Sequence, residues 1–321
     1  MKALDRIKSK ADSLQRKNPV SAFAYGVMKK FSEDRAGQQA ALLAYYGFFS
    51  LFPLLLFSVT VLGFVLRNNP QLQQRVLHSA LSQFPIIGDQ LQHNVTGLTK
   101  SGLALVIGLG GALWAGLAAI KAAQNAMNRI WDVPIRREPG AVKQVGKAAI
   151  VLVVLGVFVI ASTVLSGAGA GSGGHHLVMR LVTLPVSLAL DWIVFLIAFK
   201  VLTVAEVSFS DVAPGAAIGG LAWFVLQAVG NFYVARTLKN ASALYGFFGV
   251  VIGLLSWMYL SAQMMILAAE INVVKKNKLW PRSLSNDNLT DADRRALRRH
   301  AEYEERVPQE DVDARFERRS A

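Results

Sequence analysis

GLALVIGLGGALWAGLAAIKAAQNAMNRIWD, residues 102–132, is the stretch that decides the fold of this chain. Its first nineteen residues carry no charge and are rich in glycine and alanine, as in a transmembrane helix that packs closely against its neighbours. The remainder stays in helical register but is polar, and one face is formed at i, i+4, i+7 and i+11 by Lys121, Asn125, Asn128 and Asp132. Two interpretations fit: a polar functional site at a membrane surface, or an ordinary helix end anchored by Trp131.

The rest of the chain repeats this apolar pattern. It has 321 residues, of which 53% are hydrophobic and only 17% charged, and the uncharged runs are long enough to cross about 30 Å of hydrocarbon. We therefore predict an all-α membrane protein. Its six transmembrane helices are expected at about 36–66, 102–123, 148–167, 181–204, 213–235 and 244–270.

Three further segments surround the predicted transmembrane domain, which occupies 36–279. The cytoplasmic segment 1–35 contains apolar residues at helical spacing over Val20–Phe31, which predicts an amphipathic helix, either on the membrane surface or packed against the bundle. The outer loop 67–101 is expected to form short amphipathic helices. The charged segment 280–321 is expected to be a largely disordered cytoplasmic tail, although Thr290 and Asp293 fit the start of a short helix.

The distribution of basic residues predicts the orientation. With six spans, 28 of the 34 Lys and Arg residues fall on the side that holds both termini, so both termini are expected in the cytoplasm of a bacterial inner membrane. The net charge of +13 then lies along the anionic inner leaflet, which favours membrane lipids as partners over nucleic acid. The chain has no cysteine, and its five histidines match no metal-binding spacing, so neither a cofactor nor a metal is predicted.

Polar residues inside the spans are the candidate binding residues. An ionised side chain such as Asp191 is costly in hydrocarbon and normally faces the bundle interior or water, although a structural aspartate is the alternative. We hypothesise a cavity that opens to the cytoplasmic side. Its candidate residues are Tyr45, Tyr46, Lys121, Asn125, Asn128, Arg129, Asp191, Gln227, Gln263, Glu270 and Asn272. Structural roles are expected for Pro53, as a helix kink, and for the packing glycines Gly111, Gly116, Gly215, Gly219, Gly249 and Gly253.

Several motifs together resemble the YihY/BrkB family of bacterial inner-membrane proteins. They are Ala44-Tyr45-Tyr46 with Ser50–Pro53, Trp114–Gly116 with Asn125–Trp131, and Tyr245-Gly246 with Trp257–Tyr259 and Ala269–Asn272, within about residues 20–280. The resemblance implies a helical protein with six spans and a link to serum resistance and the cell envelope, and a role in moving lipids or lipid-linked precursors has been suggested for the family. It implies no catalytic residues, although the family once carried the label ribonuclease BN.

Three functions are compatible with this pattern. The first is binding or translocation of a lipid or lipid-linked envelope precursor. The second is a scaffold that binds envelope or secretion partners through its tails, and the third is a membrane-embedded enzyme. A ribonuclease is disfavoured because the sequence lacks a cluster of histidines and carboxylates that could hold catalytic metals. We therefore expect a protein that is not an enzyme.

Overall fold

The computed structural model describes residues 12–65, 71, 102–151, 176–233 and 239–316, apart from 14, 138–139, 141–142, 148–149 and 286–287. The described part is helical throughout and contains no strand. Three of its helical segments are long and apolar enough to cross a membrane: Leu184–Leu202, Phe209–Gly230 and Val251–Lys276. These coincide with the predicted fourth, fifth and sixth spans.

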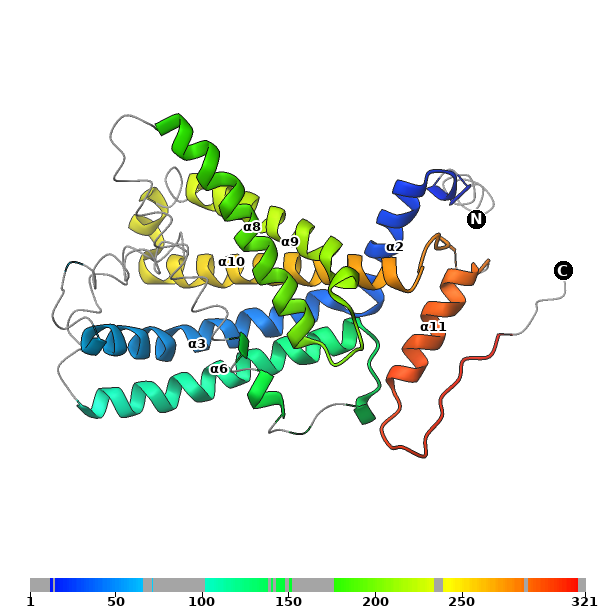
Figure 1. Ribbon diagram of the computed structural model, residues 1–321, viewed down its shortest axis with the longest axis horizontal. Helices are drawn as coiled ribbons and strands as arrows, with labels where there is room; N and C mark the ends of the chain where they lie inside the picture. Colours follow the sequence, from blue (N-terminus) through cyan, green and yellow to red (C-terminus); the bar gives the residue numbers. More distant parts are fainter. Residues whose placement is uncertain are drawn as a thin grey trace.

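Two more long helices cover the predicted first and second spans. They are α3 (Ala36–Val65) and α6 (Gly102–Ile130), and they pack along each other over most of their lengths (Figure 1). The predicted third span and the predicted outer helices of 67–101 lie almost entirely outside the described residues. The count of six spans and the cytoplasmic position of the termini therefore stay predictions.

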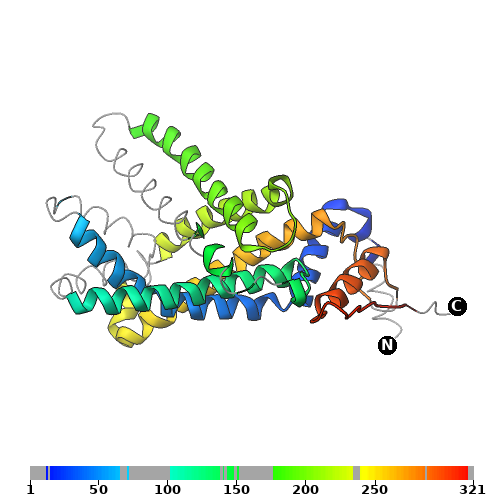
Figure 2. The same ribbon diagram turned by 60° about the horizontal axis from the view of Figure 1, so that its bottom comes forward.

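The bundle is built around α10 (Lys239–Lys276), which packs against α3 on one side and α9 (Phe209–Tyr233) on the other. Helix α8 (His176–Leu202) packs on α9 and leans away from the α3–α6 pair, as Figures 1 and 2 both show. Helix α10 has 38 residues, more than the about 20 that cross the hydrocarbon of a bilayer, and its segment Val251–Lys276 is the part long and apolar enough to span.

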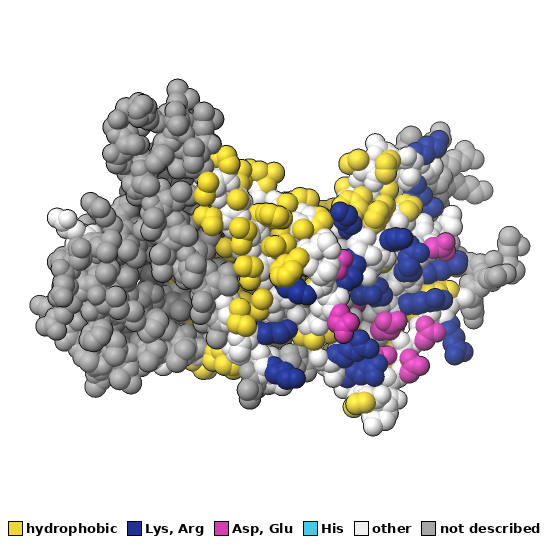
Figure 3. All heavy atoms as spheres, viewed as in Figure 1, with side chains coloured by type: hydrophobic (Ala, Val, Ile, Leu, Met, Phe, Trp, Pro, Cys, Tyr) yellow, Lys and Arg dark blue, Asp and Glu magenta, His cyan; other side chains and the backbone are white. Residues whose placement is uncertain are grey.

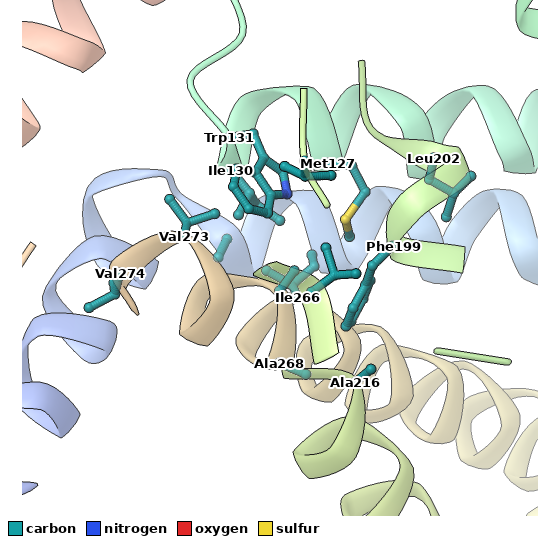
Figure 4. Packing of buried hydrophobic residues seen from close by; sticks show 14 of the residues in the cluster. Met127, Ile130, Trp131, Phe199, Leu202, Ala216, Ile266, Ala268, Val273 and Val274 are labelled. Carbon is teal, nitrogen blue, oxygen red and sulfur yellow. The ribbon is translucent and has the colours of Figure 1, made fainter. Parts of the chain in front are cut away.

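The best-packed part of the molecule lies where α6, α8, α9 and α10 meet. Figure 4 shows Met127 of α6 and Trp131, which directly follows α6, turned toward Ile266 of α10 and Phe199 of α8, and all four side chains are buried. On the α9 side, Gly215 allows the closest approach, since an added Cβ would collide with the Ala268 carbonyl oxygen of α10. Close contact of this kind replaces the hydrophobic effect as the stabilising term inside a membrane.

The other residues predicted to have structural roles differ in how closely they contact neighbouring helices. A Cβ on Gly219 would lie 2.8 Å from the Phe195 ring, whereas one on Gly116 would meet nothing within 4 Å. Gly111, Gly249 and Gly253 are half-buried. Pro53 lies within α3, as predicted, but its side chain is outside the described set.

The predicted N-terminal helix is present as α2 (Pro19–Glu33). The Asn18 side chain caps it by accepting from the Val20 amide at 2.9 Å, and Pro19 occupies the first turn, where it needs no hydrogen-bond donor. Phe23 makes an edge-to-face contact with Trp280, and Gly26 lies against the Leu279 carbonyl. The helix therefore packs on the end of α10, which is the second of the two predicted arrangements.

The C-terminal segment differs from the disordered tail that the sequence led us to expect. Residues 291–303 form α11 (Asp291–Tyr303), which begins with a full capping box between Thr290 and Asp293. Its apolar positions are few, so sequence hydrophobicity gave no sign of docking. Charged contacts to α2 hold it in place instead. Helices α2 and α11 consequently lie at the same end of the bundle (Figure 1).

The described surface has two zones. On the face drawn in Figure 3, an apolar zone covers the middle of the molecule, and Lys, Arg, Asp and Glu side chains gather at the end that carries α2 and α11. Exposed apolar residues such as Leu221, Val225 and Val229 of α9 belong to a surface suited to lipid.

Candidate functional site

Four charged side chains are buried together where α2, α6 and α10 meet. We call Lys30, Asp34, Asp132 and Glu270 the ion cluster. The Lys30 ammonium lies 2.6 Å from the Asp34 carboxylate and 3.3 Å from the Asp132 carboxylate. Glu270, near the end of α10, has no exposed surface. Three carboxyl groups thus surround one amine in a site removed from water.

Two residues of α11 close the ion cluster toward solvent. Arg299 approaches Asp132 at 3.4 Å and donates to the Trp131 carbonyl at 2.9 Å. The Nδ1 atom of His300 lies 3.8 Å from the other Asp132 oxygen, and 40% of the His300 side chain is exposed. Arg129 of α6 donates to the Asp34 carbonyl at 3.0 Å and lies over the Tyr303 ring. The docked tail is therefore part of the site.

Helix endings place these carboxylates. Asp34 caps α2, and Arg35 follows in the left-handed region with φ 52°. Helix α6 ends at Ile130, and Asp132 turns left-handed with φ 49°, while the Val133 amide bonds back to the Asn128 carbonyl and the Asp132 amide to that of Arg129. This is a Schellman ending with aspartate in the position that glycine usually takes. The strain, about 1 kcal/mol, is consistent with a carboxylate held where the site requires it.

Burial and opposite charges nearby shift the pKa values of the groups outside the spans in opposite directions. Burial disfavours the Lys30 ammonium, but Glu270, Asp34 and Asp132 outweigh it and raise its pKa. Burial, with Asp132 adding to it, raises the pKa of Asp34 despite Lys30. Burial by itself would raise the pKa of Asp132, but Lys30 and the α11 residues His300 and Arg299 outweigh it and lower this pKa. The hydrogen bond from His300 to Asp132 raises the pKa of that imidazole.

Asp34, Asp132 and His300 also present ligand atoms within 4.8 Å of one another, a spacing at which a metal ion could bind. The Lys30 ammonium, however, contacts both carboxylates and occupies the place of a cation between them. A metal would have to displace this amine or bind beside it. The donor set therefore matches an internal ion pair better than a metal centre.

A second group of charged side chains lies close by, centred on the buried Arg282 and Asp293. We call it the tail clamp, and it consists of Arg282, Asp293, Glu33 and Lys29. Arg282 has no exposed surface, bonds Asp293 at 2.6 Å and reaches both Glu33 oxygens at 2.7 and 2.8 Å. Lys29 donates to Asp293 at 2.9 Å and to the Ser283 carbonyl at 2.8 Å. Arg282 and Lys29 outweigh burial and hold the pKa of Asp293 well below its usual range. The clamp joins α2 to α11.

The polar face predicted on α6 is divided in the structure. Lys121 and Asn125 are exposed, whereas Asn128 and Asp132 are buried. The helix ending accounts for Asp132, which lies beyond Ile130 in a turn and no longer shares the helical register, whereas Asn128 is buried within α6 against the link between α8 and α9. The candidates at the start of this face and those at its end belong to different environments.

Two predicted cavity residues serve as polar contacts between elements. Asn128 accepts from the Val204 amide at 3.1 Å, which ties α6 to the link between α8 and α9. Asn272 accepts from the Gly215 amide at 2.7 Å, within the first turns of α9. Asn128 thus satisfies a backbone amide in the link after α8, and Asn272 satisfies one within α9. Packing alone accounts for both amides.

The other candidates lie apart from the ion cluster. Asp191 is buried on α8 opposite Gly220 of α9, and Gln227 is half-buried on α9. Gln263 donates to Tyr259 of the same helix at 2.9 Å. Tyr45 and Tyr46 of α3 are exposed, at 53% and 37%. Of the eleven candidates, Glu270 belongs to the ion cluster, and Arg129 contacts it through the Asp34 carbonyl.

Three lysines surround the link between α8 and α9. Lys147 donates to the Thr203 carbonyl at 3.0 Å, Lys276 donates to the Glu206 carbonyl at 2.8 Å, and Lys200 donates to the Val207 carbonyl. Burial and the neighbouring charge of Lys200 lower the pKa of Lys147. Two ammonium groups that repel each other form a local positive field.

Sequence reasoning missed most members of the ion cluster and the tail clamp. Lys30 and Asp34 stand in a segment read as cytoplasmic, and Arg282, Asp293, Arg299 and His300 stand in the charged tail. One signal was available: Lys30 follows Phe23 and Val27 at helical spacing, on the buried face of α2. No spacing pattern in the sequence indicated that Lys29 and Glu33 would pair with Arg282 and Asp293.

Comparisons with known proteins relate the chain to a family of membrane proteins. The family profile described as virulence factor BrkB matches residues 27–290. Ribonuclease-like protein YfkH of Bacillus subtilis is 28% identical over 273 residues, which cover 80% of this chain and 97% of that protein. Inner membrane protein YhjD of Escherichia coli is 23% identical over 287 residues, covering 83% and 84%. A UPF0761 membrane protein of Acinetobacter baylyi is 24% identical over 258 residues, covering 78% and 61%. No solved structure matches the chain.

Proposed function

Because the chain belongs to the BrkB family of membrane proteins, we propose that it binds, and moves across the inner membrane, a lipid or lipid-linked envelope precursor. The substrate's head group would enter from the cytoplasmic side along a polar surface. The observation that carries this proposal is the exposed pair Lys121 and Asn125, on one face of a helix whose preceding nineteen residues are uncharged.

An exposed lysine and amide in a membrane helix favour a wet or ligand-covered face, since facing hydrocarbon would cost a lysine at least ~2.5 kcal/mol. Gln124, on the adjoining side of α6, is buried and reaches the Gln144 carbonyl at 3.5 Å. Asn128, one turn further along α6, contacts the link that Lys147 and Lys200 surround. An anionic head group beside this link would relieve the repulsion between the two ammonium groups.

The test is lipid identification by mass spectrometry on the full-length protein purified in mild detergent. Replacing both Lys121 and Asn125 by alanine is expected to reduce the bound anionic lipid several-fold. The matched control is Lys275→Ala, which removes an exposed lysine from the end of α10. An unchanged lipid content in the double variant would contradict the proposal. Transfer of a labelled phospholipid between leaflets of proteoliposomes then separates translocation from binding.

One observation favours a scaffold as the second candidate. Helix α11 is ordered and presents Arg294 and Leu297 to solvent, a face on which a protein partner could dock. Changing both to alanine leaves the tail clamp intact and is expected to abolish partner binding under this alternative. Lipid transfer would then be unaffected. A relative named ribonuclease-like makes RNA hydrolysis a further assay, and we expect this protein to show none.

A further inference from the structure

The ion cluster contains more acidic groups than its cations can balance. Asp34, Asp132 and Glu270 are buried beside a single buried amine, Lys30. Arg299 and His300 of α11 reach only Asp132, at 3.4 and 3.8 Å. If all three carboxyl groups were ionised, Asp34 and Glu270 would share one amine that already contacts Asp132. Among the described residues, the Asp34 and Glu270 carboxyl groups therefore have no second cation of their own in contact with them.

Glu270 is the group that lacks a partner. Its side chain is fully buried, and neither carboxyl oxygen accepts a hydrogen bond from the described residues. The charged groups that act on it are Lys30, Asp34 and Asp132, and the Asp34 carboxyl is one of its immediate neighbours. Two acceptors facing each other repel unless a proton lies between them.

We infer that the Glu270 and Asp34 carboxyl groups share one exchangeable proton, so that the ion cluster is a proton-binding site reached from the tail side. The proton makes one carboxyl a donor to the other and supplies the missing charge. On release, the proton passes to water, and the pair becomes doubly anionic beside Lys30. Protonation and release are thus a single-proton equilibrium that needs no other reactant.

The exchange path runs toward α11. From Glu270 and Asp34, the next groups are the Lys30 ammonium at 2.6 Å from Asp34, Asp132 at 3.3 Å from Lys30, and the partly exposed His300. Lys30 is held positive by its neighbours and fixes the carboxylates, while His300 has the ordinary chemistry of a proton carrier. Chains of aspartate, glutamate and histidine are the usual form of proton relays in membrane transporters.

Other charges around the cluster are already committed. Arg129 of α6 bonds the Asp34 carbonyl, and Lys276 of α10 pairs with Asp211 of α9 at 2.8 Å. Arg282 and Lys29 belong to the tail clamp, and Arg35 follows Asp34 at the start of α3. None of these interactions supplies the Glu270 carboxyl with a donor. A proton is the simplest cation that fits beside Lys30 without displacing it.

This proton-binding site deepens the proposed function, and any role of the proton in driving transport rests on that function. Residues from the ends of α2, α6 and α10 form the site, and α11 contacts it. The site itself is tested without transport, by infrared difference spectroscopy on the full-length protein in lipid nanodiscs during a pH titration. A protonated carboxyl has a carbonyl stretch that ionised carboxylates lack. We expect this band in the wild-type protein at neutral pH and its loss at alkaline pH.

Substitutions assign the band. Glu270→Gln is expected to remove it, and Asp34→Asn to shift or remove it, while Glu302→Gln on the exposed side of α11 leaves it unchanged. His300→Ala is expected to slow its response to a pH jump and to leave its final amplitude unchanged. Asp34→Asn provides the assignment if Glu270→Gln does not fold.

Three outcomes would overturn the inference. The wild-type protein could lack a protonated carboxyl band at neutral pH. The band could persist in the Glu270 and Asp34 variants and vanish in Asp191→Asn, which would assign it to α8. Thermal stability could fall with a chelator and return with Mn²⁺, which would make the cluster a metal site. If the wild-type protein shows the band but carries no bound anionic lipid, that result counts against the proposed function alone.

Discussion

Arg282 is a residue on which the end of the structure that carries α2 and α11 depends. Its guanidinium is fully buried and bonds an aspartate of α11 on one side and a glutamate of α2 on the other. Buried ion pairs contribute little compared with a well-packed apolar group, but removing one partner leaves the other buried and unpaired. The cost of breaking the pair is therefore much larger than its net contribution.

We predict that Arg282→Met destabilises the protein by about 3–5 kcal/mol, because Asp293 stays buried with Lys29 alone. Thermal unfolding of the purified protein in detergent measures the loss. Arg294→Met, on the exposed side of the same helix, is the control and is expected to change stability by less than about 0.5 kcal/mol. Equal stability of the two variants would show that the tail clamp does not hold α11.

The same clamp sets an acid limit. The pKa of Asp293 is depressed, so its stabilising contribution is present above the ordinary aspartate value of about 3.9 and is lost as pH falls toward the folded-state value. We predict that thermal stability falls in acid, and that Asp293→Asn, which starts less stable, loses less. Parallel pH profiles for the two proteins would contradict this. Measurements of unfolding temperature below about pH 5 decide it.

At the scale of elements, the apolar helices and the start of α11 could be predicted, but the docking of α11 could not. The runs that became α3, α6, α8, α9 and α10 are defined by length and hydropathy, which act locally. Helix α11 has a readable capping box, but its docking depends on Arg282, Arg299 and His300 finding partners more than a hundred residues away. Long-range pairing of charges has no sequence period. The same reason explains why Glu270 was identified and Lys30 and Asp34 were not.

Helix α11 should also respond to pH through His300. Asp132 raises the pKa of His300, so the contact is fully present below about pH 6.5, the ordinary histidine value, and is lost as pH rises through the folded-state value. We predict that unfolding temperature declines over this rise in wild-type protein and that His300→Gln flattens the decline. Leu297→Ala, exposed on the same helix, is the control. A wild-type slope in His300→Gln would contradict the assignment.

At the scale of the whole molecule, the orientation in the membrane is the main untested prediction. The distribution of basic residues predicts that both termini lie in the cytoplasm, and the structure places α2 and α11 at one end of the bundle. The expected cavity stays a prediction, and the surroundings of its candidate residues could not be derived from the sequence, because they depend on how the helices pack. The structure distributes them among an exposed α6 face, the α8–α9 packing and the ion cluster.

Because the chain has no cysteine, single cysteines report orientation directly. Gln71→Cys lies in the predicted outer loop and Gln309→Cys in the tail, and both positions are exposed. We predict that a membrane-impermeant maleimide labels position 71 in intact bacterial cells with a permeabilised outer membrane. Position 309 should react only after the inner membrane is opened. The reverse order of labelling would invert the topology and place the ion cluster outside.

The tail clamp has a consequence for biosynthesis. Arg282 follows its partner Glu33 by 249 residues, and Asp293 follows its partner Lys29 by 264 residues. The helices between them can therefore be synthesised and inserted in the bilayer while Lys29 and Glu33 still lack these partners. Closure of the tail clamp requires that synthesis has passed Asp293, so a chain terminated before that residue would expose unmatched charges to quality-control proteases.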